Sequence, residues 1–573
     1  MEIKKNTINK TFCNFLIATS ILPVNAMANN IPPGMTMSGE LLQNNPMLNV
    51  PSAPQSKGLN ELPDQPVEKS KKEKKDSKRG PELHVSNIRV DDAPKSADKI
   101  IKKFVEQYHD KNMTIAELRE VAMDITSILQ QYGERLSYAY VPNQKIENGT
   151  VIIKIMTGHL ENISLHKNAS LIKNFSIEKY VQRIKKSKSG ITDIESQLLY
   201  LSDLPGVGEV SPFLSAGKEK GGSVLNLDLT PSSRIDGVVV FDNTGSISSG
   251  RNRIGTQINI NSPLGFGDRL QALAYYSPDF IQINKDSKHG NTIISRLSYD
   301  APVTTGGSRA GLSYSRVNYK LGGPYLHGLG DGFAEVASLY SSHSLIRSSG
   351  SNMTLGLNFD LKRMNDKFWD ESNSRSSSII SAQISGYIPK ILWNGNNILQ
   401  YQFSTTAGRL NNSDDWNGLS TKGDFYKANQ ELKFQQGLMP GVAFNLALNA
   451  QQASKNLDGA EKMSLGGPYA VRAYSNSSAS ADSAWIVSPG FSFRIPGFNG
   501  MTGQIFYDYA SGKVQKFSRY PSKVKLRGYG VGLSYEFNSK LFINASYAWR
   551  DGKDELLSSQ NKAMGWINAG YRF

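Results

Sequence analysis

The sequence predicts an exported chain whose C-terminal part folds as a transmembrane antiparallel β-barrel. Three observations support this fold class. The first 28 residues have the pattern of an export signal. Only 39% of the 573 residues are apolar, and no run of about 18 or more apolar residues could form a transmembrane helix. From residue 232 to the end, segments of roughly ten residues alternate apolar and polar side chains between turns rich in glycine, asparagine and serine.

The export signal is expected at residues 1–28. Lys4, Lys5 and Lys10 give it a positive start, and a short apolar core runs from Phe12 to Val24. Ala26-Met27-Ala28 has the small-x-small pattern of a cleavage site. The apolar core is too short to span a bilayer. The alternative interpretation is a buried N-terminal helix.

Composition excludes several classes of function. The only cysteine, Cys13, lies in the expected signal, so the exported chain would have no thiol for a metal–thiolate site or a cysteine nucleophile. The formal net charge is +15, but the basic residues are scattered and an exported chain does not meet nucleic acid. Attraction to anionic lipid headgroups, or a lumen that conducts polar chains, fits this charge better.

Two segments precede the first folded module. Residues 29–50 are polar, with some helix expected around Ser38 to Leu42. Residues 51–82 are rich in proline, serine and lysine and include a nearly continuous run of charges. Such a composition cannot bury a core, so we expect residues 51–82 to form a flexible charged linker.

Residues 83–158 are expected to form a module with the element order β-α-α-β-β. Its second helix opens with the capping box Thr114-Ile115-Ala116-Glu117 and ends at Gly133, where a glycine at C′ belongs. Its strands are expected at residues 84–91, 136–141 and 150–156.

Residues 159–231 repeat this order of elements. A strand at 160–165 precedes a short helix at 177–184, and a second capping box, Thr192-Asp193-Ile194-Glu195, is expected to open the next helix. Two closing strands follow. Capping boxes at matching places indicate that the two modules share one topology, although few residues are identical.

Residues 232–573 are expected to form the barrel. Strict alternation is clearest at residues 254–261, 353–360, 442–449 and 543–550. A strand that separates lipid from water needs one apolar face, and closure pairs every backbone group. We expect about sixteen strands, the last ending at Phe573. The alternative, a soluble β-sandwich, would not need tyrosine and tryptophan so often at strand ends.

These features resemble the TpsB transporters of two-partner secretion, which export haemolysins and filamentous haemagglutinins. The two modules are similar to POTRA domains, and Leu204-Pro205-Gly206-Val207 is similar to a motif in the second of them. The resemblance implies an outer-membrane protein with periplasmic POTRA domains and a secreted TpsA-like partner. It also implies outer-membrane lipid and lipopolysaccharide around the barrel, insertion by the barrel-assembly machinery, and a plug helix within residues 29–50.

The most specific resemblance is Val471-Arg472-Ala473-Tyr474, which is similar to the V-R-G/A-Y tip of the family's long sixth loop. Here this loop spans residues 454–483, between the expected strands eleven and twelve. In the family its arginine meets an aspartate of an F-x-D motif on strand thirteen. Phe506-Tyr507-Asp508 matches that motif.

Periodicity alone places Phe506 and Asp508 on the lumen side of their strand, because Ile505 and Tyr507 alternate with them. The alternative is a solvated loop arginine and an unrelated pore-lining aspartate. Ala473 departs from the glycine that many relatives have at that position. If the position requires a positive φ, alanine is strained there and the loop differs locally.

No catalytic, cofactor or metal site is expected. The seven histidines show no metal-ligand spacing, and the glycine-rich segments 306–310 and 528–532 do not lie at strand-to-helix turns. Two other functions remain open at this point. An outer-membrane insertase of the same superfamily usually carries more receptor modules, whereas a porin-like channel needs none.

Overall fold

A computed structural model describes residues 82–573 with short gaps, together with Ser38 and Leu41. The gaps are 135, 147, 187–189, 220, 247, 278–289, 323–326, 349, 370, 393–395, 413–419, 477, 519–521 and 553–561. The expected signal and linker therefore lie outside the described residues, as does all of the expected plug segment except Ser38 and Leu41. The described chain divides into a barrel unit, residues 235–263 and 268–573, and a unit that holds the two modules and the turn 264–267.

The first module has the expected order of elements with one addition. Its three-stranded sheet has the order β2-β5-β4, with β2 parallel to β5 and β4 antiparallel to it. Two short strands, β1 and β3, pair separately. The elements are β1 (Glu82–Val85), β2 (Asn87–Asp91), α4 (Asp98–Glu106), β3 (Lys111–Thr114), α5 (Ile115–Gln131), β4 (Tyr138–Tyr140) and β5 (Thr150–Met156).

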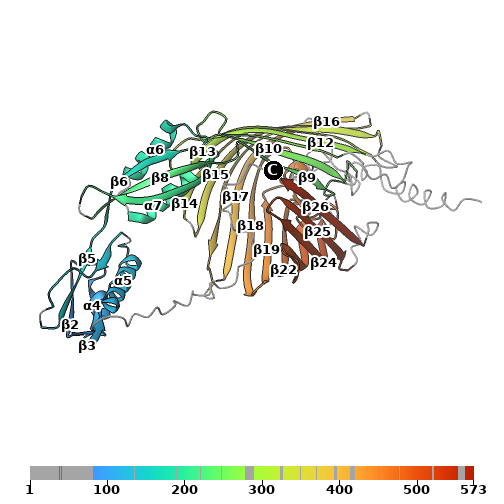
Figure 1. Cartoon of the computed structure of the whole chain (residues 1–573). Helices are drawn as coiled ribbons and strands as arrows, with labels where there is room; N and C mark the ends of the chain where they lie inside the picture. The colour runs from blue at the N-terminus through green and yellow to red at the C-terminus, as the bar shows by residue number, and fades with distance from the viewer. Residues whose placement is uncertain are drawn as a thin grey trace, which may run out of the picture. The chain divides into compact units, whose positions relative to one another are not determined.

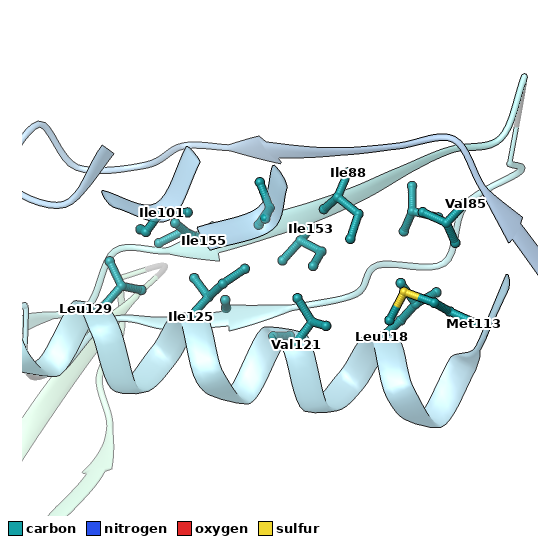
Figure 2. Packing of buried hydrophobic residues seen from close by; sticks show 14 of the residues in the cluster. Val85, Ile88, Ile101, Met113, Leu118, Val121, Ile125, Leu129, Ile153 and Ile155 are labelled. Atoms are coloured by element: carbon teal, nitrogen blue, oxygen red, sulfur yellow. The ribbon is translucent and has the colours of Figure 1, made fainter. Parts of the chain in front are cut away.

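Both predicted signals at the ends of α5 are confirmed. The Glu117 N–H donates to Thr114 Oγ1 (3.2 Å), and the Thr114 N–H donates to the Glu117 carboxylate (2.7 Å). Gly133 has φ +95°, and the Glu134 N–H donates to the Leu129 carbonyl at 2.9 Å, which closes a Schellman turn. One face of α5 packs on the sheet, as Figure 2 shows for Leu118, Val121, Ile125 and Leu129 below Ile88, Ile153 and Ile155.

The second module has the same sheet arrangement. Its strand order is β6-β8-β7, with β6 parallel and β7 antiparallel to the central β8. The elements are β6 (His159–Asn168), α6 (Asn174–Lys186), α7 (Gly190–Ser202), β7 (Val207–Ala216) and β8 (Gly222–Pro231). The prediction of a second capping box at Thr192–Glu195 is wrong. Because α7 already begins at Gly190, Thr192 lies inside the helix instead of at its N-cap position.

The barrel has sixteen antiparallel strands, the number that periodicity predicts (Figure 1). It closes where Asn568–Arg572 of the last strand pair with Val238–Asp242 of the first. The strands are β9 (Ile235–Asp242), β10 (Arg253–Asn261), β11 (Arg269–Tyr276), β12 (Asn291–Pro302), β13 (Ser308–Lys320), β14 (Gly330–Arg347), β15 (Asn352–Phe368), β16 (Glu371–Pro389), β17 (Asn397–Asn412), β18 (Gly423–Met439), β19 (Val442–Ala453), β22 (Ser483–Arg494), β23 (Met501–Lys513), β24 (Lys523–Phe537), β25 (Leu541–Arg550) and β26 (Ala563–Arg572).

Side chains alternate between the two faces of the wall. On β23, Ile505 is exposed on the outer face, whereas Phe506 and Asp508 are buried on the inner face. A barrel wall needs this arrangement, because its outside meets hydrocarbon and its inside meets water or protein. None of the helices that the structure describes is long and apolar enough to cross a membrane.

Candidate functional site in the barrel lumen

The long connection between β19 and β22 folds into the barrel. It contains a 3₁₀ turn, η2 (Gly459–Glu461), and a small hairpin of β20 (Met463–Ser464) and β21 (Ser480–Ala481). Its apolar residues Leu465, Val471 and Tyr474 are at most 1% exposed. They pack against inward-facing wall residues: Ile486, Phe506, Ala510, Val524, Leu526 and Ala548. The connection therefore occupies the lumen at this level, where it is held by apolar burial as well as by polar contacts.

The loop tip, which we define as residues Gly467–Tyr474, is a closed turn. The Gly467 N–H donates to the Tyr474 carbonyl (2.9 Å), and the Tyr474 N–H donates to the Val471 carbonyl (3.1 Å). Gly467 has φ +114°, and a Cβ there would lie 1.9 Å from Asn476 Oδ1. Glycine is therefore required at the point where the tip begins.

Arg472 and Asp508 come together inside the lumen. The guanidinium donates from Nε to Oδ2 (2.9 Å) and from Nη2 to Oδ1 (2.7 Å), a bidentate pair. The Arg472 backbone N–H also donates to Oδ2, at 3.0 Å. The Asp508 side chain is fully buried and that of Arg472 is 16% exposed. Fork-to-fork pairs of this kind combine charge with fixed geometry, so the pair also orients the tip.

Two aromatic residues complete the environment of Arg472. Its guanidinium lies over the Phe506 ring, 3.1 Å from the centroid, which gives the phenylalanine of the F-x-D motif a direct role in the contact. The Arg472 carbonyl accepts a hydrogen bond from Trp566 Nε1 at 2.7 Å. Sequence reasoning did not identify Trp566, because nothing in an alternating strand marks which inward aromatic residue meets a loop.

Ala473 and Tyr474 hold the tip against β24 and β25. Ala473 does not have a positive φ, so the condition under which alanine would be strained at this position is not met. Its methyl group packs on Gly528, where an added Cβ would lie 2.5 Å from the Ala473 Cβ. The Arg550 guanidinium lies over the Tyr474 ring at 4.4 Å. The V-R-A-Y motif thus contacts four successive strands, β23 to β26.

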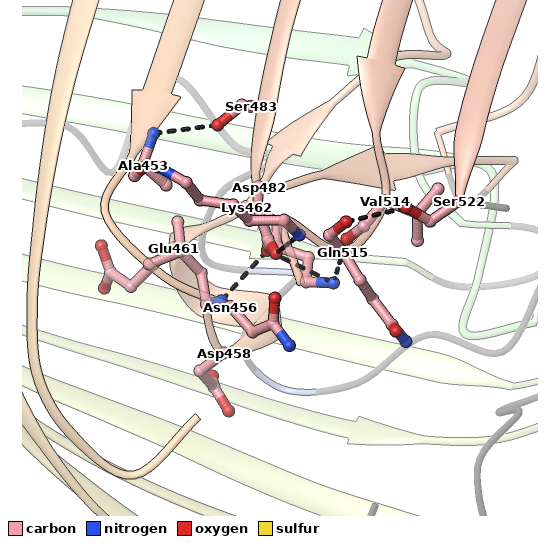
Figure 3. Close-up of polar contacts among 12 residues, drawn as sticks. Ala453, Asn456, Asp458, Glu461, Lys462, Asp482, Ser483, Val514, Gln515 and Ser522 are labelled. Carbon is pink, nitrogen blue, oxygen red and sulfur yellow. Dashed lines mark hydrogen bonds and ion pairs between the residues drawn. The ribbon is translucent and has the colours of Figure 1, made fainter. Parts of the chain in front are cut away.

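The loop base, which we define as residues Asn456–Lys462, is bound to other strands of the wall. The Glu461 carboxylate pairs with Lys362 on β15 (2.6 Å) and with Lys427 on β18 (2.9 Å). Asp458 accepts from Arg375 Nη1 on β16 (2.6 Å). Figure 3 shows Asp458 and Glu461 in the loop base, with their carboxylates pointing in different directions.

Sequence reasoning missed the loop base. Alternation does place Lys362, Arg375 and Lys427 on lumen-facing positions, which is the only signal available. Their acidic partners in the loop base lie between 34 and 99 residues away, as the Lys427–Glu461 and Lys362–Glu461 contacts show. Such pairings depend on how the loop folds back and cannot be deduced from a strand pattern.

Ser38 and Leu41 of the N-terminal segment also lie in the lumen. The Ser38 N–H and hydroxyl both donate to the Asp366 carboxylate, each at 3.0 Å. Leu41 is 8% exposed and packs with apolar residues of β11 to β13. Asp366 also accepts from the Tyr319 hydroxyl (2.7 Å) and pairs with Arg375. Because Arg375 also pairs with Asp458, one buried guanidinium joins the N-terminal segment to the loop base.

Across the ranges that the structure describes, no group of three or more His, Cys, Asp or Glu side chains could hold a metal ion. The buried acids of the lumen are each matched with a cation or with hydrogen-bond donors, which is what a structural network requires. The arrangement therefore holds chain segments in place within the barrel.

Comparisons with known proteins agree on one family. The profile of the family described as haemolysin secretion/activation protein ShlB/FhaC/HecB matches residues 221–535, and that of the ShlB-type POTRA domain matches residues 83–158. The heme/hemopexin transporter protein HuxB of Haemophilus influenzae is 27% identical over 482 residues, which cover 81% of this chain and 82% of the relative.

Solved structures share the fold. CdiB from Escherichia coli aligns with a TM-score of 0.61 and 19% identity, covering 89% of this chain and 93% of its own. BamA from Haemophilus ducreyi, lacking POTRA domains 1–3, aligns with a TM-score of 0.53 and 12% identity, covering 86% and 99%. At these identities the likeness shows the fold alone.

Proposed function

This chain belongs to the haemolysin secretion/activation family of outer-membrane transporters, and we propose that it exports one unfolded TpsA-like partner protein. In this proposal the two modules are periplasmic and capture the partner, and the barrel conducts it outward in an extended form. The observation that carries the proposal is the occupied lumen. A loop latched by the Arg472–Asp508 pair closes the barrel at rest and has to move when a chain passes.

The second module offers an edge for capture. In its sheet β7 pairs with β8 on one side, and no other described strand pairs with it. Phe213 and Leu214 on β7 are 41% and 51% exposed. An extended chain can add to such an edge through backbone hydrogen bonds, while exposed apolar side chains favour an unfolded partner.

The remaining parts have supporting roles in the proposal. Residues 1–28 export the chain, residues 29–50 form a plug helix around Ser38 and Leu41, and residues 51–82 tether the plug flexibly to the receptor. The barrel-assembly machinery inserts the barrel, and outer-membrane lipid and lipopolysaccharide surround it. The chain acts as a transporter without catalysing a reaction, and nucleic acid is not a partner.

Deletion of residues 83–230 tests the receptor role. The barrel should still insert, since its wall is closed without the modules, but the partner should no longer reach the medium. Separate deletions of 83–158 and 159–230 show which module is required. Undiminished secretion at normal barrel abundance would remove the receptor role from the proposal.

Two measurements separate this proposal from its alternatives. Conductance of the full-length protein in planar bilayers should be small and fluctuating, because the loop and the N-terminal segment occlude the lumen; a stable, porin-sized conductance would favour a passive channel. Removing the protein from cells should leave the abundance of other outer-membrane barrels unchanged. A general fall in their abundance would favour an insertase.

A further inference from the structure

The outer face of β24 carries a basic ladder at one end. Lys523, Lys525 and Arg527 alternate with Val524 and Leu526, which face the loop tip. The three cationic side chains are therefore on the outer face, and all three are exposed. Alternate residues lie about 6.6 Å apart along a strand, so three positive charges follow one another at that spacing.

Aromatic side chains show at which depth of the membrane this ladder lies. On the same face, Tyr529 follows Arg527 and stacks with Trp549 at 5.8 Å between centroids. Tyr509, which is in register with Arg527, lies 5.1 Å from Trp485. Tyrosine and tryptophan gather where hydrocarbon meets headgroups. From the level of these rings, the ladder continues through Lys525 to Lys523, towards the end of the barrel from which the long loop enters. Its charges are consequently at the level of outer-leaflet headgroups.

One further cation joins the ladder from the next strand. Lys513 of β23 is paired in register with Lys523 and is also exposed. The nearby carboxylate of Asp551 accepts a hydrogen bond from the Tyr507 hydroxyl at 2.7 Å. The cations therefore outnumber the described acids at this place, leaving a positive patch against the lipid.

A groove of about 770 Å³ runs along the outer wall to this patch. Its lining includes outward-facing residues of β17 to β23, among them Thr405, Ala428, Ala450 and Trp485. Lys513 and Lys523 also line it, so the groove reaches the ladder. None of the described residues of the loop between 456 and 482 lines it, and the lining residues Thr405, Ala450 and Trp485 alternate with inward-facing neighbours, so the groove is on the lipid side of the wall.

We propose that the ladder and the groove bind a phosphorylated lipid of the outer leaflet, such as the lipid A part of lipopolysaccharide. The phosphate oxygens accept from Lys523, Lys525 and Arg527, and acyl chains lie along the groove. Cation-to-phosphate hydrogen bonds are strong because both partners are charged, and the arginine fork matches two phosphate oxygens. This site rests on the proposed placement of the barrel in the outer membrane.

The opposite part of the wall supplies a matched control. On β13 to β15, Arg316 pairs with Glu335 (2.6 Å), and Glu335 is in register with Arg363. Lys367, further along β15, is likewise in register with an acid, Asp331. Exposed cations there alternate with acids across the strands, so a phosphate meets less net positive charge.

The test measures binding of diphosphoryl lipid A to purified full-length protein by native mass spectrometry. Each variant is first checked for the heat-modifiable migration of a folded barrel. The triple variant Lys523→Gln, Lys525→Gln, Arg527→Gln should bind at least tenfold more weakly than wild type. The control Arg363→Gln, Lys367→Gln should stay within twofold. Inorganic phosphate at equal concentration should not compete, and lipid A without phosphates should not bind.

Three results would contradict the proposed lipid site. Equal binding by the triple variant, an equal loss in the control, or full competition by inorganic phosphate would each do so. If the triple variant does not fold, Lys525→Gln should bind more weakly and Lys525→Arg should match wild type; no difference between them counts against the site. Partner secretion is measured separately in cells. Lost lipid binding with normal secretion leaves the transport proposal intact, and lost secretion with normal lipid binding leaves the site intact.

Discussion

The tip and the base of the lumen loop are held in different ways. The ion pairing of the tip rests on a single carboxylate, Asp508, which receives three hydrogen bonds from Arg472. The base distributes its charges, because Glu461 has two lysine partners and Arg375 has two aspartate partners. A single pair can be released in one step, whereas a shared network keeps partial contacts when one is lost. We therefore propose that the tip is the part of the loop that is released and that the base anchors the loop to the wall.

One buried position in the tip and one in the base can report separately on how often each part of the loop leaves the wall. Val471 in the tip and Ala460 in the base are 0% and 2% exposed. In a Cys13→Ser background, Val471→Cys or Ala460→Cys becomes the only thiol of the chain. Maleimide labelling of each thiol then measures how often the tip or the base leaves the wall.

Asp508→Ala should have the largest effect on the tip. It leaves the Arg472 guanidinium uncompensated in a largely buried place, which costs about 3–5 kcal/mol in opening free energy. Labelling at Val471→Cys should rise more than about a hundredfold, since each 1.4 kcal/mol is tenfold. Labelling at Ala460→Cys should change little. A rise of the same size at both reporters would mean that tip and base open as one unit.

Arg375→Ala should have the largest effect on the base. Asp458 loses its cation but keeps the hydrogen bond from the Ala460 N–H (3.0 Å), and Asp366 keeps the Tyr319 hydroxyl and the Ser38 contacts, so neither carboxylate is left without a donor. Hydrogen bonds to charged groups contribute about 1.5–3 kcal/mol, so labelling at Ala460→Cys should rise roughly ten- to a hundredfold. Labelling at Val471→Cys is the control and should stay near wild type.

Lys427→Ala should have a smaller effect on the base, because Glu461 keeps its bond to Lys362. We expect an increase in labelling at Ala460→Cys of about tenfold or less, corresponding to about 1 kcal/mol. Lys362→Ala is the matched variant on the other side of the same carboxylate. Effects of Lys427→Ala as large as those of Asp508→Ala would contradict the distributed anchor.

Ser38→Ala should have the smallest effect. It removes one hydroxyl donor from Asp366, which retains the backbone N–H of residue 38, Tyr319 and Arg375. About 1 kcal/mol or less should be lost from the hold on the N-terminal segment. A reporter cysteine in place of Leu41 should show at most about a fivefold rise in labelling. Labelling at Val471→Cys in the tip should not change.

The same contrast explains what the sequence could predict. Alternation identifies the barrel and the lumen-facing side of Phe506 and Asp508, because a wall between lipid and lumen imposes a period of two. The resemblance to a family identifies Arg472 as the partner of Asp508. The base was missed because its ion pairs join a loop to distant strands. The error at Thr192 is local, since a capping box does not fix a helix start when the helix can begin earlier.

The central claim is that Arg472 and Asp508 act as one latch whose release is part of transport. The most direct measurement is partner secreted per folded barrel in Arg472→Ala, Asp508→Ala and the double variant. We expect both single variants to secrete far less than wild type at near-normal barrel abundance, because the closed wall does not depend on the pair. The double variant should be no worse than the poorer single variant, as expected for two residues that work as a unit. Wild-type secretion by both single variants would contradict the latch.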